Sequence, residues 1–482
     1  MMTGICWYLF SRIGLDEAII REHTFAWLVF LSMSLYRILP LIATMLEFHS
    51  IGYNFVVPLD TYCGETVLYL ISALAFYLAI NTKGSLIWLK KVLFKCGFYA
   101  RTSSNILWAL GIFGLLIRLY LMSYRVEFGD VIGKTLSGFT FFQYAPFLLF
   151  FPSLYKNRIY NEILTYNRNA LLYFILLIIL SFATNSRYAI IEPLGTFAIL
   201  FMLSYIQVPS SQRKQSSKGY VISGCILVIF IVPFVSDVSL AMLANRGIRG
   251  KVDKIELFKK TIDTYLDDKK MNNLRRLKDI KDNKDRDEAI SLISNSPKWS
   301  EIYVRNFALN RYCNLKVTDN TLYHAEKIGF ANPRMQEKFW TDIITLLPTP
   351  ILNFLGFNYD KKENSYSRGD LLKALSENRS PFGSFLITSH LADGLAVFGY
   401  FYFPLEFILF FLRFLFLDTF LLKFNGRVYY SIFGLITIFS FLAMFRNAGG
   451  GCDSLGYLLR GYWQDIILFL IAFFILRRFA KY

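Results

Sequence analysis

Arginine is the residue type whose placement in this chain most directly indicates chemistry. Arg187 lies in a short turn, 185–187, between two apolar segments, and Arg246 and Arg249 alternate with glycines just after a third. Arg446 ends a further apolar segment. A guanidinium presents paired N–H donors that match phosphate oxygens, and neighbouring glycines let backbone N–H groups approach the same anion. We therefore predict that these four arginines hold a phosphate-bearing substrate.

Contact with lipid headgroups is an alternative explanation for all of these arginines, and it is weaker for Arg187, because two short spans hold that residue near the membrane boundary. Arg118 and Arg460 lie close to segment ends, where contact with lipid headgroups explains them as well as substrate binding does. Arg37 lies deeper, within the first apolar segment. An unpaired charge at the centre of a membrane helix costs about 3 kcal/mol on insertion scales. Arg37 is therefore predicted to have a partner or to face an aqueous cavity.

His390 and Asp393 form a second group, just before another apolar segment. An imidazole at a membrane edge can accept a proton near neutral pH, and a residue three positions on shares its helical face. We therefore consider His390 a candidate general base and Asp393 the group that orients it. A helix cap or an interfacial polar pair explains the same spacing.

Cysteine and motif patterns exclude several other kinds of chemistry. The six cysteines are scattered, without a CxxC pair or histidines at ligand spacing, which argues against a disulfide framework and a zinc site. No GxSxG, HExxH, P-loop or Rossmann motif occurs in a workable context. We expect a site without metal and without cofactor.

The composition indicates an integral membrane protein. The chain is 55% hydrophobic and 18% aromatic, and only 18% of its residues are charged. The formal charge of +17 could indicate nucleic-acid binding, but the basic residues gather in short loops beside apolar segments, as membrane topology requires. We therefore expect no nucleic-acid partner. The N-terminal region has no cleavage pattern, so the first span is expected to act as the insertion signal.

About ten apolar segments approach the ~20 residues needed to cross a bilayer. They are 24–46, 65–81, 104–122, 137–154, 170–184, 188–207, 221–236, 395–421, 428–446 and 463–479. Every second short connection between them is basic, from residues 83–101 to residues 423–427. Since basic loops stay in the cytoplasm, both termini are predicted to be cytoplasmic.

One connection, residues 237–393, is far longer than ordinary loops. Counting spans places it on the outer side, and long loops translocate largely regardless of charge. The predicted organisation is seven membrane helices in 1–236, this insertion, and three membrane helices in 394–482. Within the insertion, apolar residues at 255, 258, 262 and 266 predict an amphipathic helix.

The apolar segment 339–357 of the insertion could alter this count. It contains Asp342, Pro348 and Pro350, and if it spanned, the downstream basic ends would lie outside, against the charge bias. We predict an interfacial or re-entrant segment, with a buried helix inside the insertion as the alternative.

The layout and a few short motifs resemble the bacterial O-antigen and capsule repeat-unit polymerases and, more distantly, the O-antigen ligase. The turn 185–187 is similar to the family's Ser-Arg turn, with Asn where Gly is common. Arg246 and Arg249 open the large outward loop, where family members place functional arginines. The stretch 390–399 resembles the family's His-Asn…Leu…Gly sequence, with Leu391 in place of Asn.

The resemblance implies an all-α, GT-C-like polytopic fold in the bacterial inner membrane, with a large, mostly helical periplasmic loop. It implies a polymerase that joins undecaprenyl-diphosphate-linked oligosaccharide units into O-antigen or capsular polysaccharide. Membrane lipids and a chain-length regulator protein are the further partners expected. The site residues fall into three roles: the diphosphate held by Arg187, Arg246, Arg249 and Arg446, the acceptor hydroxyl deprotonated by His390 with Asp393, and the glycan bound by Arg305, Arg311 and Trp340.

Two other functions stay open. A lipid-linked oligosaccharide flippase or other transporter would place charged groups along a central cavity, rather than in one large outward loop. Another lipid-phosphate-dependent glycosyltransferase, or the ligase itself, would share much of the same chemistry. Sensitivity to a chelator would favour a glycosyltransferase that uses a metal.

Overall fold

The first two predicted spans each form one long helix in the computed structural model. α3 (Thr24–Leu46) coincides with the predicted segment. α4 (Pro58–Asn81) begins seven residues before the predicted start at residue 65, because Pro58 occupies its first position. Proline suits that position, since the N–H it lacks would have no helical partner there. The two helices pack against each other.

The structure describes most of the chain. The described residues are 1–82, 84, 86–124, 131–156, 163–183, 187–207, 237–238, 240–245, 254–277, 299, 303–304, 309–310, 315–347, 349–354, 356, 366–380, 384–424, 427–444 and 450–479.

Six helices among these residues are long and apolar enough to cross a membrane. They are Thr24–Leu46, Pro58–Asn81, Ser104–Met122, Tyr188–Gln207, His390–Phe420 and Asp453–Phe479. The protein is therefore an all-α, multi-pass membrane protein by the length and composition of its helices. The predicted span 170–184 forms the shorter helix α9 (Arg168–Ala183). The predicted span 221–236 lies outside the described residues.

The chain folds into two compact units, each assembled from separate stretches of sequence. The first comprises Met1–Leu86, Asp282–Asp418 and Phe441–Gln464, and the second comprises Ile87–Lys281, Thr419–Ser440 and Asp465–Tyr482. Elements of the first unit are α1 (Met2–Ile13), α2 (Glu17–Glu22), α3, α4, α15 (Lys316–Ile328), α16 (Pro333–Ile344), α17 (Thr349–Phe354), α18 (Arg368–Glu377), α19 (His390–Phe398), η4 (Gly399–Phe401), α20 (Tyr402–Leu417), α23 (Asp453–Gly456) and η6 (Tyr457–Gly461).

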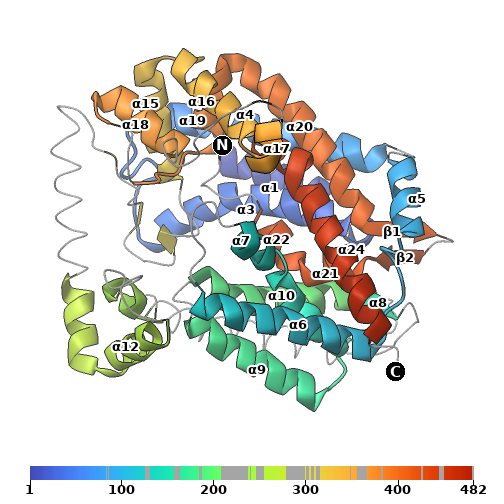
Figure 1. Cartoon of the computed structure of the whole chain (residues 1–482). Helices are drawn as coiled ribbons and strands as arrows, with labels where there is room; N and C mark the ends of the chain where they lie inside the picture. Colours follow the sequence, from blue (N-terminus) through green and yellow to red (C-terminus); the bar gives the residue numbers. More distant parts are fainter. Residues whose placement is uncertain are drawn as a thin grey trace. The chain divides into compact units, whose positions relative to one another are not determined.

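The second unit contains the remaining helices and a small hairpin (Figure 1). Its elements are α5 (Ile87–Lys95), α6 (Ser104–Ser123), α7 (Val131–Ser137), η1 (Thr140–Phe150), α8 (Pro152–Tyr155), α9, α10 (Arg187–Gln207), α12 (Lys254–Leu266), β1 (Leu421–Phe424), β2 (Arg427–Tyr430) and α21 (Ile432–Ile436). Three described helices contain residues of both units: η5 (Asp418–Phe420), α22 (Ile438–Leu442) and α24 (Tyr462–Phe479).

The predicted span 137–154 differs from the structure, where it is divided among α7, the 3₁₀ helix η1 and α8. η1 packs closely on α6, at Gly111 and Gly114. A Cβ atom at either glycine would lie within 3.0 Å of η1 atoms, closer than real Cβ atoms come. Arg118 of α6 donates to the Gln143 side chain of η1 (2.8 Å) and to Ser181 of α9 (3.0 Å). Arg118 is thus buried and links three helical segments. This structural role explains its position without a contact to lipid or to substrate.

The predicted span 428–446 is also not one helix. Its first residues belong to β2, which pairs with β1 in an antiparallel hairpin with Leu421 opposite Tyr430. The short helices α21 and α22 follow, separated at Thr437. Backbone pairing with β1 occupies the N–H and C=O groups that a continuous helix would use, and hydropathy alone cannot reveal such pairing.

The insertion is largely helical where it is described. α15 and α16 pack on α19, and α18 packs on α15 and α16, all within the first unit (Figure 1). α15 is polar in composition, yet most of its residues are buried. The described residues of 339–357 include the end of α16 and the short α17, and neither helix is among the candidate spans, in agreement with the prediction. Its placement at the membrane interface stays a prediction.

α12 confirms the predicted amphipathic helix but buries a different face. Leu257, Thr261 and Thr264 are buried, whereas Ile262 and Leu266 are exposed. Tyr265 packs against a small core of Ile190, Val238 and Met242. The face chosen by tertiary packing is therefore rotated from the one that periodicity predicts.

In the first unit, two pairs of segments that are predicted to share a membrane face contact each other. At one end of its helices, the N–H groups of Val56 and Val57 donate to Asp319 of the insertion (2.9 and 2.7 Å). At the start of α3 and the end of α20, His23 Nδ1 lies 2.8 Å from Asp418 Oδ1. The membrane face on which each pairing lies stays a prediction.

Arg37 has the partner that its position requires. Its guanidinium forms an ion pair with Glu65 of α4 (2.9 Å), and both side chains are buried. Thr318 of α15 donates to the second oxygen of Glu65 (3.0 Å). The insertion therefore takes part in the polar core between two candidate membrane helices.

Removing one member of this pair should destabilise the protein more than changing both. Arg37→Met leaves Glu65 buried without its cation, and we expect a loss of about 3–5 kcal/mol in the free energy of unfolding. Arg37→Met combined with Glu65→Gln leaves no unpaired charge and should cost less than Arg37→Met alone. Thermal unfolding of the purified variants measures both. A double variant less stable than Arg37→Met would contradict the coupling.

His324 of α15 is a second buried ionisable group of the insertion. Its Nδ1 lies 2.7 Å from the Ser376 hydroxyl, and its ring stacks on Trp299 with ring centroids 5.1 Å apart. Burial lowers the pKa of His324 to about 4, and the charges of Lys327 and Lys373 act in the same direction. The folded protein therefore holds a neutral imidazole at neutral pH.

This shift predicts a loss of stability at acid pH. Above the ordinary pKa of 6.5, the imidazole is neutral in both states and costs nothing. As the pH falls from 6.5 towards 4, the unfolded chain takes up a proton that the folded protein excludes. The free energy of unfolding then falls by about 1.4 kcal/mol for each unit of pKa difference. Thermal unfolding of wild type and His324→Leu between pH 4 and pH 7.5 isolates the effect, because the variant should lose this part of the pH dependence. Parallel pH profiles would contradict it.

Candidate functional site

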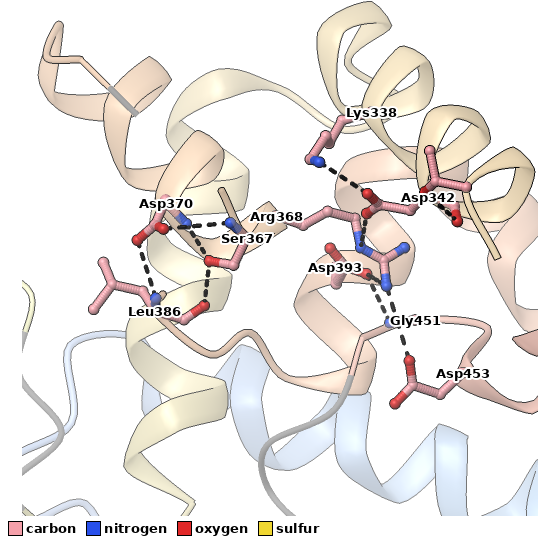
Figure 2. Close-up of polar contacts among 10 residues, drawn as sticks. Lys338, Asp342, Ser367, Arg368, Asp370, Leu386, Asp393, Gly451 and Asp453 are labelled. Carbon is pink, nitrogen blue, oxygen red and sulfur yellow. Dashed lines mark hydrogen bonds and ion pairs between the residues drawn. The ribbon is translucent and has the colours of Figure 1, made fainter. Parts of the chain in front are cut away.

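Arg368 contacts three carboxylates from separate elements of the first unit (Figure 2). Its Nη2 lies 3.2 Å from Asp393 Oδ2 and 3.9 Å from Asp453 Oδ1, and its Nε lies 3.7 Å from Asp342 Oδ2. Lys338 pairs with the other oxygen of Asp342 at 2.8 Å. We call Asp342, Arg368, Asp393 and Asp453 the Arg368 cluster. It joins α16 and α18 of the insertion to the starts of two candidate spans.

A capping arrangement fixes the position of Arg368 at the first residue of α18. Ser367 and Asp370 form a reciprocal capping box, which satisfies backbone N–H groups at the helix start. Asp370 also accepts the backbone N–H groups of Phe385 and Leu386 (2.9 and 3.0 Å). The chain just before α19 is thus tied to the start of α18, which aims Arg368 at Asp393.

Two glycines bring the segment before α23 close to α19. The N–H of Gly451 donates to Asp393 Oδ2 (2.8 Å). A Cβ atom at Gly451 would lie 2.5 Å from Gly394 Cα, and one at Gly450 would overlap the Arg368 guanidinium. At Gly451, where the neighbouring atoms are backbone, only glycine leaves room for this approach. Asp393 therefore receives two donors on one oxygen, from Arg368 and from Gly451.

The three carboxylates of the cluster differ in their exposure to solvent. Asp393 is fully buried, whereas the side chains of Asp342 and Asp453 are 38% and 48% exposed. Burial by itself lowers the pKa of Arg368, but the charges of Asp393, Asp453 and Asp342 outweigh it and raise that pKa above its ordinary value. Arg368 is therefore a permanent cation that favours the ionised form of its partners.

α20 also carries two buried charged residues, Glu406 and Arg413, which contact the segment that follows Gly451. Glu406 accepts the N–H of Cys452 (3.1 Å). Arg413, two helical turns further on, donates to Ser454 (3.0 Å) and stacks over the Tyr457 ring. These contacts hold the segment from Gly451 to Tyr457 along α20.

Several buried polar atoms here have no hydrogen-bond partner in the described part of the chain. They are Asp393 Oδ1, the Tyr402 hydroxyl, Glu406 Oε1 and Arg413 Nε. Unsatisfied buried polar groups are costly, and they gather where a protein binds water, ions or substrate. Asp393 thus combines a fixed, charge-assisted oxygen with a second, buried oxygen that has no donor among the described residues. That arrangement suits a carboxylate that accepts a proton or a hydroxyl hydrogen bond.

The structure brings one of the two predicted catalytic residues into the cluster. Asp393 lies within it, and its Oδ2 is held by Arg368 and Gly451. His390 lies at the first position of α19, buried one turn before Asp393, and Ser389 caps the helix there. That Asp393 orients His390 stays a prediction; in the structure Asp393 also has its own cationic partner, Arg368.

None of the other predicted site residues takes part in the contacts that define the cluster, and several lie outside the described part of the chain. Trp340 of α16 is half exposed, and its ring stands edge-on to Phe398. Arg187 begins α10, but its side chain is not among those described. Arg460 donates to Gln464 (2.9 Å) and to the Leu346 carbonyl of the insertion (2.7 Å). The remaining predicted arginines lie outside the described residues: Arg246, Arg249, Arg305, Arg311 and Arg446.

Arg368, Asp453, Gly450 and Gly451 were not among the site residues predicted from the sequence. Two local signals were present. Residues 367–370 read Ser-Arg-Gly-Asp, a capping-box pattern that indicates a helix start. Residues 449–453 read Gly-Gly-Gly-Cys-Asp, and three consecutive glycines before a predicted span indicate close backbone approach.

Comparison with protein-family models, with curated proteins and with solved structures gave no match. Within the described residues, no group of three or more His, Cys, Asp or Glu side chains is arranged to hold a metal ion. The functional assignment therefore depends on the chemistry of the Arg368 cluster and on the sequence motifs.

Proposed function

We propose that this chain is a polymerase that joins undecaprenyl-diphosphate-linked oligosaccharide units into O-antigen or capsular polysaccharide. The observation that carries the proposal is the Arg368 cluster, in which a long polar insertion and the ends of candidate membrane helices share one charged site. A lipid-linked glycan has an apolar tail and a polar head, so its reacting bond belongs at such a junction.

Asp393 is the proposed general base. Its Oδ2 is occupied by Arg368 and Gly451, while Oδ1 has no partner in the described part of the chain. Oδ1 would accept the proton of the acceptor sugar's hydroxyl as that oxygen attacks the anomeric carbon of the donor glycan. The bond from the anomeric carbon to the diphosphate oxygen breaks, and undecaprenyl diphosphate leaves with the bonding electrons.

The leaving diphosphate needs cationic partners, and the sequence supplies them. Arg187, Arg246, Arg249 and Arg446 stay the proposed diphosphate ligands, since guanidinium groups suit phosphate oxygens, and Arg246 and Arg249 are also followed by glycines. Arg305 and Arg311 stay candidates for glycan binding. His390, buried one turn before Asp393, is proposed to assist the base rather than replace it.

Deletion of the gene and complementation with plasmid-borne variants test the proposed activity. We expect the deletion strain to lose the polysaccharide ladder on a gel and to keep the form with a single repeat unit. Wild type should restore the ladder. Loss of every repeat unit would contradict a polymerase and favour a flippase or a ligase, whereas an unchanged ladder would exclude all three.

The proposed site also requires the insertion to face the periplasm, with both termini in the cytoplasm. Arg379 follows α18 and its side chain is 72% exposed, whereas Cys96, at the end of α5, lies in a predicted cytoplasmic connection. A membrane-impermeant maleimide on spheroplasts should label Arg379→Cys above the wild-type level. The Cys96 signal, identified with Cys96→Ser, should appear only after permeabilisation. The reverse pattern would contradict the orientation.

A further inference from the structure

α5 (Ile87–Lys95) presents an unusual surface between two candidate membrane spans. The spans α4 and α6 end at Asn81 and begin at Ser104, so the intervening residues return to the same membrane face that they leave. Leu89 and Leu93, one helical turn apart, are buried. The opposite side of the helix is exposed.

The exposed side of α5 combines apolar and cationic side chains. Trp88 and Phe94 are 61% and 62% exposed, and Ile87 and Val92 are each 48% exposed. At 100° per residue, the exposed Lys91 and Lys95 fall between the pair Trp88 and Val92 and the pair Ile87 and Phe94. A helix that faced only water would not expose four large apolar side chains around two lysines.

We propose that α5 lies in the membrane interface and binds anionic phospholipids. Trp88 and the aliphatic side chains reach the acyl boundary, where tryptophan is enriched, and the lysine ammonium groups pair with headgroup phosphates. Lysine stems are themselves apolar, so Lys91 and Lys95 can follow the apolar surface up to the phosphates. The partner is the anionic lipid of the bilayer, recognised by charge and acyl contact together. The inference does not depend on the polymerase activity.

Lipid selectivity of the reconstituted full-length protein tests the charge component. Spin-labelled phosphatidylglycerol and phosphatidylcholine report which lipid is enriched next to the protein in mixed vesicles. We expect wild type to favour phosphatidylglycerol, and Lys91→Gln with Lys95→Gln to lower that preference at least twofold. Lys259→Gln with Lys269→Gln removes the same charge from exposed lysines elsewhere and should leave the preference unchanged. Equal effects of the two double variants, or no effect of the first, would overturn the proposal.

A photoreactive residue tests the apolar component. Benzoylphenylalanine in place of Trp88 should form adducts with phospholipid on irradiation, detected by mass spectrometry. The same residue in place of Lys259 should give few or none. Adducts of the Trp88 position with protein alone would instead show that another polypeptide surface covers α5, and would also overturn the proposal.

Discussion

Asp393→Asn is expected to reduce polymer formation by about 10²–10⁴-fold, the range that general acid–base catalysis contributes. The amide has nearly the same shape as the carboxylate, so the packing around Gly451 is kept. It cannot take the proton of an acceptor hydroxyl, however. Polymer length on gels and the turnover of lipid-linked units in proteoliposomes measure the loss, with the protein level checked in each strain.

Variants at two further positions, Asp342 and Arg368, separate the proposed proton-accepting role of Asp393 from the structural role of the cluster. Asp342→Asn also removes one carboxylate from Arg368, but Asp342 is partly exposed and Lys338 remains beside it. We expect this variant to lose less than tenfold of the activity, because an exposed ion pair contributes little. Arg368→Lys keeps the cation without the paired geometry and should retain more activity than Arg368→Gln. Full-length polymer in Asp393→Asn at normal protein level would remove Asp393 from the mechanism.

Gly451→Ala is expected to disrupt the site itself. The added methyl group would meet backbone atoms of Gly394, with Cα only 2.5 Å away. A backbone cannot move aside as a flexible side chain can, so the segment before α23 must shift away from Asp393. Overpacking of this kind costs about 1–3 kcal/mol, and the Gly451 N–H would leave the carboxylate. Lower thermal stability and lower polymer formation should appear together.

Gly456→Ala is the matched control for that substitution. Gly456 lies on the same segment, but its added methyl group would meet only Leu346 Cδ1, at an ordinary 3.8 Å. We expect its unfolding temperature to stay near that of wild type. If Gly451→Ala also unfolds at the wild-type temperature, the close approach of this segment to α19 is wrong.

The Arg37 pair illustrates how far local sequence can reach. A charge inside an apolar segment has to be compensated, so the existence of a partner followed from the sequence. Its identity did not, because Glu65 and Thr318 come from a different helix and from the insertion. The need to compensate a buried charge can be read from one segment, whereas the identity of the partner depends on how the helices pack.

The amino-acid sequence by itself determined the long apolar helices, the polar insertion and the amphipathic character of residues 254–266. These features depend on hydropathy and helical periodicity, which each segment carries within its own residues. Tertiary structure decided that residues 140–150 form a 3₁₀ helix against α6 and that residues 427–430 pair as a strand. It also decided the Arg368 cluster, since Asp342, Arg368, Asp393 and Asp453 are distant in sequence and meet only when α16, α18, α19 and α23 pack together.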